Sequence, residues 1–339
     1  MNGYIFSQIK INEIARLTGT SAALVSRYFK NQEENRVTRV NQRIVGIQPS
    51  AAQDYLKNAG LDYFYMPSVT LFANLCGGVG KTSGVANLSA SLRRIVNKET
   101  PIVLIDGDSQ ASLTGMIFGK EADDEDSILV DYLEGKAKLD DIVTPLHDNI
   151  WVMKSNLNQA WIEKVLVKPK EIKEGMLNLY KEIFSKFGSD TKIFQDHTPQ
   201  LSNLFASSVC ALFHLPNTIK KSILIPMRSD SVAINGANYI IKEIEDVCET
   251  FSRDYDSIGI HCYFSNVDRR FSTTSEALEL IKKKPRVMRH LASPIIRTCA
   301  DITKSTMSHQ NIFSSGKSSN AIEDFQDLMQ FTYQYGVER

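Results

Sequence analysis

A run of glycine, lysine and hydroxyl side chains around residue 80 has the composition and spacing of a phosphate-binding loop. Residues 76–83 read C-G-G-V-G-K-T-S, directly after an apolar run over 69–72 that is typical of a buried strand. Glycines let backbone N–H groups approach a polyphosphate closely, and the positive end of a following helix adds to the attraction. Lys81 would reach the β- and γ-phosphates, and the Thr82 hydroxyl would ligate Mg²⁺. The pattern therefore predicts a nucleotide site.

The predicted nucleotide contacts in this loop share one short segment. They are Gly77, Gly78, Val79, Gly80, Lys81, Thr82 and Ser83. The alternative is a glycine turn between a strand and a helix, in which Lys81 is merely solvated. Strand, glycine loop and helix in this order favour the phosphate-binding interpretation.

Two aspartate-bearing segments follow further apolar runs. Residues 101–106 (P-I-V-L-I-D) lead into Gly107 and Asp108, and residues 191–196 (T-K-I-F-Q-D) end at Asp196. Carboxylates at the carboxyl ends of parallel strands lie where the sites of α/β proteins form. A solvated acidic turn is the alternative for 106–108, and the loop upstream favours a functional role. Strands alternating with helices predict an α/β fold with a parallel, doubly wound sheet.

Composition limits the class of protein. The 339 residues are 42% apolar and 23% charged, which is typical of a soluble globular protein. Lys+Arg and Asp+Glu both number 39, so any nucleic-acid binding must come from local patches. Five scattered cysteines show no C-x-x-C spacing and indicate neither a disulfide framework nor zinc. Without a signal peptide or an apolar run of ~18 residues, we expect a cytoplasmic protein that spans no membrane.

The N-terminal segment carries a second pattern. An apolar-faced helix over 11–17, a turn at Gly19 and an N-cap at Ser21 predict a second helix from residue 22. We expect that helix to turn Leu24, Val25 and Tyr28 inward. Its outward residues would be Ala22, Ala23, Ser26, Arg27 and Lys30. This arrangement resembles a DNA-binding helix-turn-helix, whose second helix enters the major groove; any αα-hairpin is the alternative.

Two short alternating segments, 36–40 and 43–47, follow this pair of helices. They read as strands joined at Asn41-Gln42 and would form a wing. The wing would carry Arg36, Arg39 and Arg43 toward DNA phosphates. We therefore predict a winged helix-turn-helix DNA-binding domain with its connector over 1–66, followed by a larger domain over 67–339. The predicted DNA contacts are Ser26, Arg27, Lys30, Arg36, Arg39 and Arg43.

Residues 76–83 and 106–110 together resemble the deviant Walker A and Walker A′ motifs of the ParA/MinD family of P-loop ATPases, over roughly residues 68–335. The resemblance implies ATP and Mg²⁺ as cofactors and makes Lys81 and Asp108 catalytic, with Asp108 positioning the attacking water. Thr82, Asp106 and Asp196 would serve the Mg²⁺. By the same resemblance, Pro226 would border the adenine and Arg297 would lie near a DNA surface. Ser109 and Thr198 replace prolines that the family usually has there.

An N-terminal helix-turn-helix ahead of such an ATPase is similar to the larger ParA- and SopA-type plasmid partition ATPases. That resemblance implies an ATP-bound homodimer on nucleoid DNA, a ParB-like centromere-binding partner, and repression of its own operon. A membrane-associated MinD-like protein is set aside, because the last helix carries Glu323, Asp324 and Asp327 and no basic residue. A nucleotide-sensing DNA-binding regulator with weak or no turnover, and a cargo-positioning ATPase, stay open.

One residue departs from the family pattern. The family's signature lysine, which reaches the partner's phosphates across an ATP-bound dimer, is replaced by Cys76. A thiol is neutral near pH 7 and short. Closing a dimer over uncompensated phosphate charge would be costly. We therefore expect compensation from Lys164, Lys168 or Lys170, which the sequence does not rank.

Overall fold

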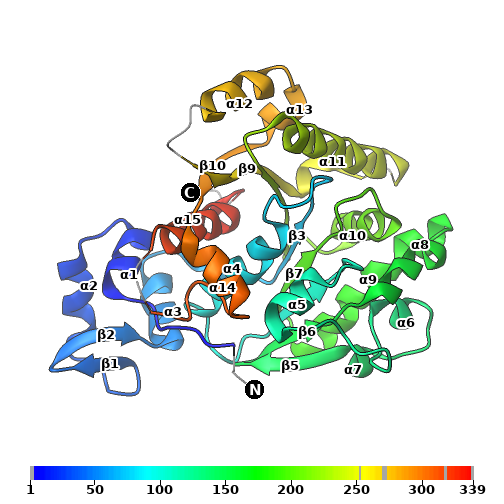
Figure 1. Cartoon of the computed structure of the whole chain (residues 1–339). Coiled ribbons are helices and arrows are strands. Elements are labelled where there is room, and N and C mark those ends of the chain that lie inside the picture. The colour runs from blue at the N-terminus through cyan, green and yellow to red at the C-terminus, as the bar shows by residue number, and fades with distance from the viewer. Residues whose placement is uncertain (1–3, 252, 269–272, 317–318, 337–339) are drawn as a thin grey trace.

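The structure, a computed structural model, describes residues 4–251, 253–268, 273–316 and 319–336, and centres on an eight-stranded sheet (Figure 1). In spatial order the strands are β10 (Leu291–Arg297), β9 (Gly259–Val267), β8 (Lys220–Met227), β3 (Ser68–Phe72), β7 (Lys192–Asp196), β4 (Ile102–Asp106), β6 (Ile150–Met153) and β5 (Val143–His147). All neighbouring pairs are parallel except β5 and β6. The predicted doubly wound α/β fold is confirmed, with one antiparallel edge strand that the sequence analysis did not foresee.

Helices cover both faces of this sheet, because the crossovers between parallel strands place them there. One face carries α6 (Leu129–Leu133), α7 (Leu139–Ile142), α8 (Ile162–Val165), α9 (Pro169–Phe187), α10 (Asn203–His214), α11 (Ser231–Thr250), α12 (Thr273–Lys282) and α13 (Pro285–Arg289). The other carries α4 (Lys81–Arg93), α5 (Ser112–Phe118), α14 (Ala300–Met307) and α15 (Asn320–Gln334). Short 3₁₀ turns are η1 (Asp62–Tyr65), η2 (Leu157–Trp161) and η3 (Tyr255–Ser257).

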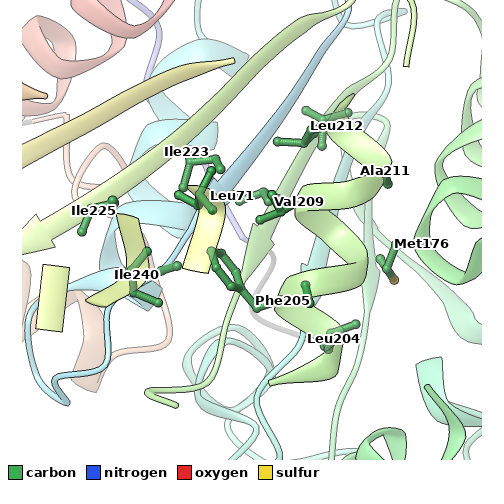
Figure 2. Packing of buried hydrophobic residues seen from close by; sticks show 14 of the residues in the cluster. Leu71, Met176, Leu204, Phe205, Val209, Ala211, Leu212, Ile223, Ile225 and Ile240 are labelled. Atoms are coloured by element: carbon green, nitrogen blue, oxygen red, sulfur yellow. The ribbon is translucent and has the colours of Figure 1, made fainter. Parts of the chain in front are cut away.

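The central strands are buried on both faces. Figure 2 shows Leu71 of β3 and Ile223 of β8 packed against Phe205 and Val209 of α10. On the opposite face α4 approaches β3 so closely that a Cβ at Gly84 would meet the Phe72 ring at 2.4 Å. The glycine at 84 therefore allows this close packing of α4 on β3.

The N-terminal elements follow the predicted order. They are α1 (Ile11–Thr18), α2 (Ala22–Phe29), β1 (Val37–Val40), β2 (Arg43–Ile47) and α3 (Pro49–Asn58). Gly19 ends α1 with a φ of 65°, and the Ser21 hydroxyl accepts a hydrogen bond from Leu24 N at 3.3 Å. Strands β1 and β2 pair antiparallel across Asn41 and Gln42, both with positive φ.

The predicted orientation of α2 is wrong in part. Leu24 and Tyr28 are 58% and 36% exposed, whereas Val25 and Phe29 are fully buried. Val25 and Phe29, four residues apart, share the helix face that packs into the buried cluster. Phe29 meets the ring of Tyr55 in α3 at 5.4 Å between centroids.

The N-terminal elements and the sheet domain share one hydrophobic cluster. Ile14 of α1 and Phe64 of η1 belong to the same buried cluster as Leu88 of α4 and Phe325 of α15. Arg94, just after α4, forms two hydrogen bonds of 2.7 and 2.8 Å to the Glu13 carboxylate of α1. Helix α4 therefore runs from residue 81 to direct contact with the N-terminal segment. Among the described residues, no helix combines the length and apolar character needed to cross a bilayer.

Candidate functional site

The phosphate-binding loop lies at the carboxyl end of β3 and leads into α4. Gly78 and Gly80 have φ of 67° and 95°, and Gly80 occupies the N-cap position of α4. A Cβ at Gly80 would also meet Ser265 Oγ at 2.8 Å. Both backbone strain and close approach therefore require glycine here, and the loop presents its N–H groups at a helix N-terminus.

Lys81 is held across the loop by main-chain oxygens. Its Nζ donates to the carbonyls of Asn74 and Cys76, each at 3.2 Å. Burial lowers the pKa of the Lys81 ammonium, while the nearby Asp196 and Asp108 oppose that shift. A desolvated ammonium bonded only to neutral carbonyls is ready to exchange them for anionic oxygens.

Asn74, which the sequence analysis missed, fixes the start of the loop. Its Nδ2 donates to the carbonyls of Pro226 at 2.8 Å and Ala233 at 3.2 Å, and its Oδ1 accepts from Cys76 N at 2.9 Å. This fully buried amide joins β3, β8 and α11. An asparagine that follows the apolar run over 69–72 was the available signal in the sequence.

Two buried carboxylates face each other at the ends of β4 and β7, where Asp106 and Asp196 are register partners. Asp196 Oδ2 accepts a hydrogen bond from Thr82 Oγ1 at 2.6 Å. Asp106 Oδ2 accepts from Thr114 N and Oγ1 at 2.8 and 2.6 Å. Burial raises the pKa of Asp106 to about 6; burial, with the Asp106 charge second, raises the pKa of Asp196 to about 8. A nearby cation would therefore stabilise the charged form of both carboxyl groups.

Asp108 lies on the turn after β4, beside the loop. Its Oδ1 accepts from Gln110 N at 2.9 Å, and its carbonyl accepts from Ser155 Oγ at 2.7 Å. These contacts orient the carboxylate, and no salt bridge to Asp108 is present among the described residues. Asp108 thus keeps acceptor capacity for a water molecule or a nucleotide group.

The loop and Asp108 line one cavity of about 410 Å³. Its walls are Gly77, Gly78, Gly80, Lys81, Thr82, Ser83, Asp108, Gln110, Ser112 and Pro199. A second cavity of about 160 Å³ also touches Gly78, Gly80 and Ser83. Its far wall includes Tyr263, Asn266, Ile296, Thr298 and Phe325. The two cavities share loop glycines, so both adjoin the phosphate-binding loop.

The residues present fit a Mg²⁺ ion. Asp196 Oδ1 is buried and has no hydrogen-bond partner within the described chain, and Thr82 lies on the other oxygen of the same carboxylate. No cluster of three or more His, Cys, Asp or Glu side chains in the described ranges could hold a metal alone. Mg²⁺ commonly uses one or two carboxylates with water and phosphate oxygens, so this small donor set is compatible with it.

Two further predicted site residues, Pro226 and Arg297, have partners within the described chain. Pro226 is buried inside β8, and its carbonyl is occupied by Asn74. It lines neither cavity, so an adenine contact there lacks geometric support. Arg297 lines the smaller cavity, and its guanidinium pairs with Asp324 at 2.5 Å.

The predicted DNA contacts differ in what they touch. Arg27, Lys30 and Arg43 are exposed, and Ser26 is half-buried. Arg36 pairs with Asp54 at 2.6 Å. Arg39 instead donates to the carbonyls of Phe29, Lys30 and Gln32, at 3.4, 3.1 and 2.8 Å. Arg39 therefore closes the end of α2 rather than standing free in the wing.

The three lysines expected to compensate for Cys76 have other partners. Lys164 lies over the Trp161 ring at 3.8 Å, Lys168 pairs with Glu171 at 3.3 Å, and Lys170 is 4.0 Å from Glu174. None of them lines either cavity. A different cation, Arg228, touches Cys76 and Gly77. Nothing in the local sequence around 228 indicated that contact.

A glycine loop between a strand and a helix, with carboxylates on the neighbouring strand ends, defines a P-loop nucleotide-binding protein. A sequence model of the AAA domain family matches residues 68–256, more than half of the chain, so the chain belongs to that family.

Individual relatives and solved structures agree with this class. A ParA family protein of Mycoplasma pneumoniae is 19% identical over 223 residues, covering 63% of this chain and 76% of its own length. The fold is similar to a single-residue variant of Cyanothece McdA in complex with ATP, with a TM-score of 0.61 at 15% identity, covering 81% and 98% of the two chains. It is also similar to a putative plasmid partition protein of Borrelia burgdorferi bound to AMPPNP, with a TM-score of 0.57 at 17% identity, covering 78% and 98%. The chain therefore has the fold of ParA-like P-loop proteins.

Proposed function

We propose that this protein is a Mg²⁺-dependent ATPase of the ParA type that binds DNA and drives DNA partition. The observation that carries the proposal is the convergence of Lys81, Thr82, Asp108 and Asp196 around one glycine loop. A structural turn would need neither a buried lysine nor paired buried carboxylates, each of which is costly without a ligand.

Each group has a defined part in this proposal. Lys81 leaves the Asn74 and Cys76 carbonyls to bind β- and γ-phosphate oxygens, and the N–H groups of the loop bind the remaining ones. Thr82 and Asp196 hold Mg²⁺, which offsets charge on the phosphates, while Asp106 supports them from the next strand. Asp108 orients the attacking water, for which its acceptor capacity is suited.

The nucleoside, in this proposal, occupies the smaller cavity rather than a place beside Pro226. That cavity adjoins the loop and offers the Ile296 and Phe325 side chains together with polar groups of Asn266 and Thr298. A base has apolar faces and polar edges, and a pocket of this mixed character accommodates both.

DNA binding is proposed for the N-terminal domain, residues 1–66. Arg27 and Lys30 lie exposed on or just after α2, and Arg43 is exposed on β2. Arg36 and Arg39 hold internal contacts and support this surface indirectly. Arg297 would first have to leave Asp324 before it could contact DNA. Binding by this domain would account for an operator-specific, autoregulatory function on the nucleoid.

The partition proposal further includes an ATP-bound homodimer and a ParB-like partner that stimulates hydrolysis. Two similarities support it. The fold resembles that of a putative plasmid partition protein, and the sequence is similar to that of a ParA family protein. The similarity to McdA keeps a cargo-positioning ATPase as the second candidate.

An assay of ATP hydrolysis by the purified full chain with Mg²⁺ distinguishes these candidate functions. Turnover that rises with DNA and with the protein encoded next to this one is expected of a partition ATPase. Nucleotide binding without turnover would instead indicate a nucleotide-sensing regulator. Turnover on random DNA without any sequence-specific binding by residues 1–66 would favour cargo positioning.

A further inference from the structure

One arginine contacts the phosphate-binding loop from outside it. Arg228 follows β8, and its Nη1 donates to the Gly77 carbonyl at 3.2 Å. Its Nη2 lies 3.5 Å from Cys76 Sγ, and a Cβ at Gly78 would meet Nη1 at 3.4 Å. The guanidinium therefore lies against the first three residues of the loop.

The orientation of this side chain is fixed from its other end. Arg228 Nε donates to Asp230 Oδ2 at 2.8 Å, while Asp230 Oδ1 accepts from Ala233 N at 2.9 Å at the start of α11. Asp230 thus caps a 20-residue helix and holds Arg228 at the same time. The side chain is 37% exposed, so the pairing by itself contributes little stability.

The contacts that Arg228 makes with the loop are weak and replaceable. A guanidinium carries five N–H donors, and three of them have partners among the described residues: a carboxylate, a carbonyl and a thiol. The carbonyl and the thiol are neutral acceptors. Arginine binds phosphate in a planar, two-bond geometry that a carbonyl and a thiol do not match.

The balance of charges at the loop favours an additional cation there. Lys81 is the lysine inside the loop, and Asp106, Asp108 and Asp196 lie on the adjoining strand ends. A nucleoside triphosphate would add several negative charges to a site that already holds these three acidic side chains. Cys76 contributes no positive charge where it lies, so a second cation beside it offsets part of that excess.

We propose that Arg228 is a phosphate-binding residue of the nucleotide site, and that Asp230 positions it. On nucleotide binding the guanidinium exchanges the Gly77 carbonyl and the Cys76 thiol for β- and γ-phosphate oxygens. This inference rests on the proposed nucleotide function and assigns the missing positive charge to Arg228 in place of Lys164, Lys168 or Lys170.

Calorimetric titration of ATP, ADP and AMP into the full chain with Mg²⁺ tests the assignment. Arg228→Ala should weaken ATP binding by about 10- to 100-fold, as expected for a lost charge-assisted contact, and leave AMP binding within about threefold. Arg228→Lys should recover part of the loss. Arg286→Ala is the matched control, because Arg286 also bonds a carboxylate through Nε, at 2.5 Å from Glu245, and lines neither cavity of the site.

Asp230→Asn tests the positioning role, since asparagine is an equally good helix cap and only the charge of the Arg228 partner is lost. We expect this variant to weaken ATP binding in the parent chain and to have no further effect in Arg228→Ala. Unchanged ATP affinity in Arg228→Ala, or equal losses for ATP and AMP, would overturn the assignment. If Lys81→Ala then still lost ATP, the proposed nucleotide function would stand while the role of Arg228 fell. A parent chain that binds no ATP would refute both.

Discussion

The nucleotide loop and the N-terminal domain hold their basic side chains in opposite ways. Lys81 bonds to two carbonyls of the loop at 3.2 Å, and Arg228, anchored by Asp230 through Nε, places its other nitrogens on the Gly77 carbonyl and the Cys76 thiol. In the N-terminal domain, Arg36 pairs with a carboxylate and Arg39 closes the end of α2. A cation on a neutral acceptor gains by moving to phosphate, whereas a cation that caps a helix must first break structure.

Basic residues near a proposed site should therefore be classified by the partners that they already have in the structure. At the loop the cations are available to a ligand. Among the predicted DNA contacts of the N-terminal domain, the basic residues Arg27, Lys30 and Arg43 are exposed. Four experiments test this contrast, beginning with the largest effect.

Asp108→Ala should lower the rate of ATP hydrolysis by about 10²- to 10⁴-fold, the range typical for loss of a group that orients or activates the attacking water. ATP affinity should change little, because this carboxylate is not proposed to bind phosphate. A single-turnover assay and a binding titration on the same sample measure both. Hydrolysis at the parental rate would remove Asp108 from the mechanism.

Lys81→Ala should weaken ATP binding by about 100-fold, since the triphosphate loses a cation that is already desolvated. Lys98→Ala is the control, because Lys98 is exposed and pairs with Asp148 outside the site. Equal ATP affinity in the two variants would contradict the assignment of the loop.

Arg27→Ala and Lys30→Ala should each cost ~1–3 kcal/mol of operator binding and much less on random DNA. Arg39→Ala should instead lower the free energy of unfolding by about 1–2 kcal/mol, because three carbonyls at the end of α2 lose their donor. Binding titrations on both DNAs and urea unfolding measure these effects. The contrast fails if Arg39→Ala leaves stability unchanged while weakening operator binding.

Asp196 should make stability depend on pH. Its folded pKa, about 8, lies above the unfolded value of roughly 3.9, so its protonated form favours folding and the contribution is lost as pH rises toward 8. Lys192, whose pKa burial lowers to about 7, acts in the opposite direction above that pH. We therefore compare parent and Asp196→Asn between pH 6 and 8. In the parent chain the free energy of unfolding should fall by on the order of 1 kcal/mol per pH unit, and the variant should lack this slope. Identical profiles would contradict the raised pKa of Asp196.

The parts of the site that are local in sequence were predictable. Glycines, lysine and threonine lie next to one another in the loop, and Asp106 and Asp196 end recognisable apolar runs, so the parallel sheet brings them together. Gln195 interrupts the apolar run of β7; it is buried and donates to Ser208 Oγ at 3.1 Å, so its amide is accommodated.

The parts that depend on distant packing were not predictable. Arg228 reaches Cys76 only because β8 and β3 are neighbours, a pairing that no residue pattern specifies. Strand β5 contains Pro145 and is partly exposed, which hides it in the sequence. In α2 the adjacent pairs at 24–25 and 28–29 allow two apolar stripes, and only packing against the rest of the buried cluster decides between them.

The most direct test of the central claim is a crystal structure of Asp108→Ala with ATP and Mg²⁺. We predict phosphate oxygens in the cavity lined by the loop, within hydrogen-bond distance of Lys81 Nζ, with the Lys81 bonds to the Asn74 and Cys76 carbonyls broken. The Thr82 hydroxyl should have turned from Asp196 to the metal. A nucleotide bound elsewhere, or Lys81 still on both carbonyls beside a bound triphosphate, would contradict the account.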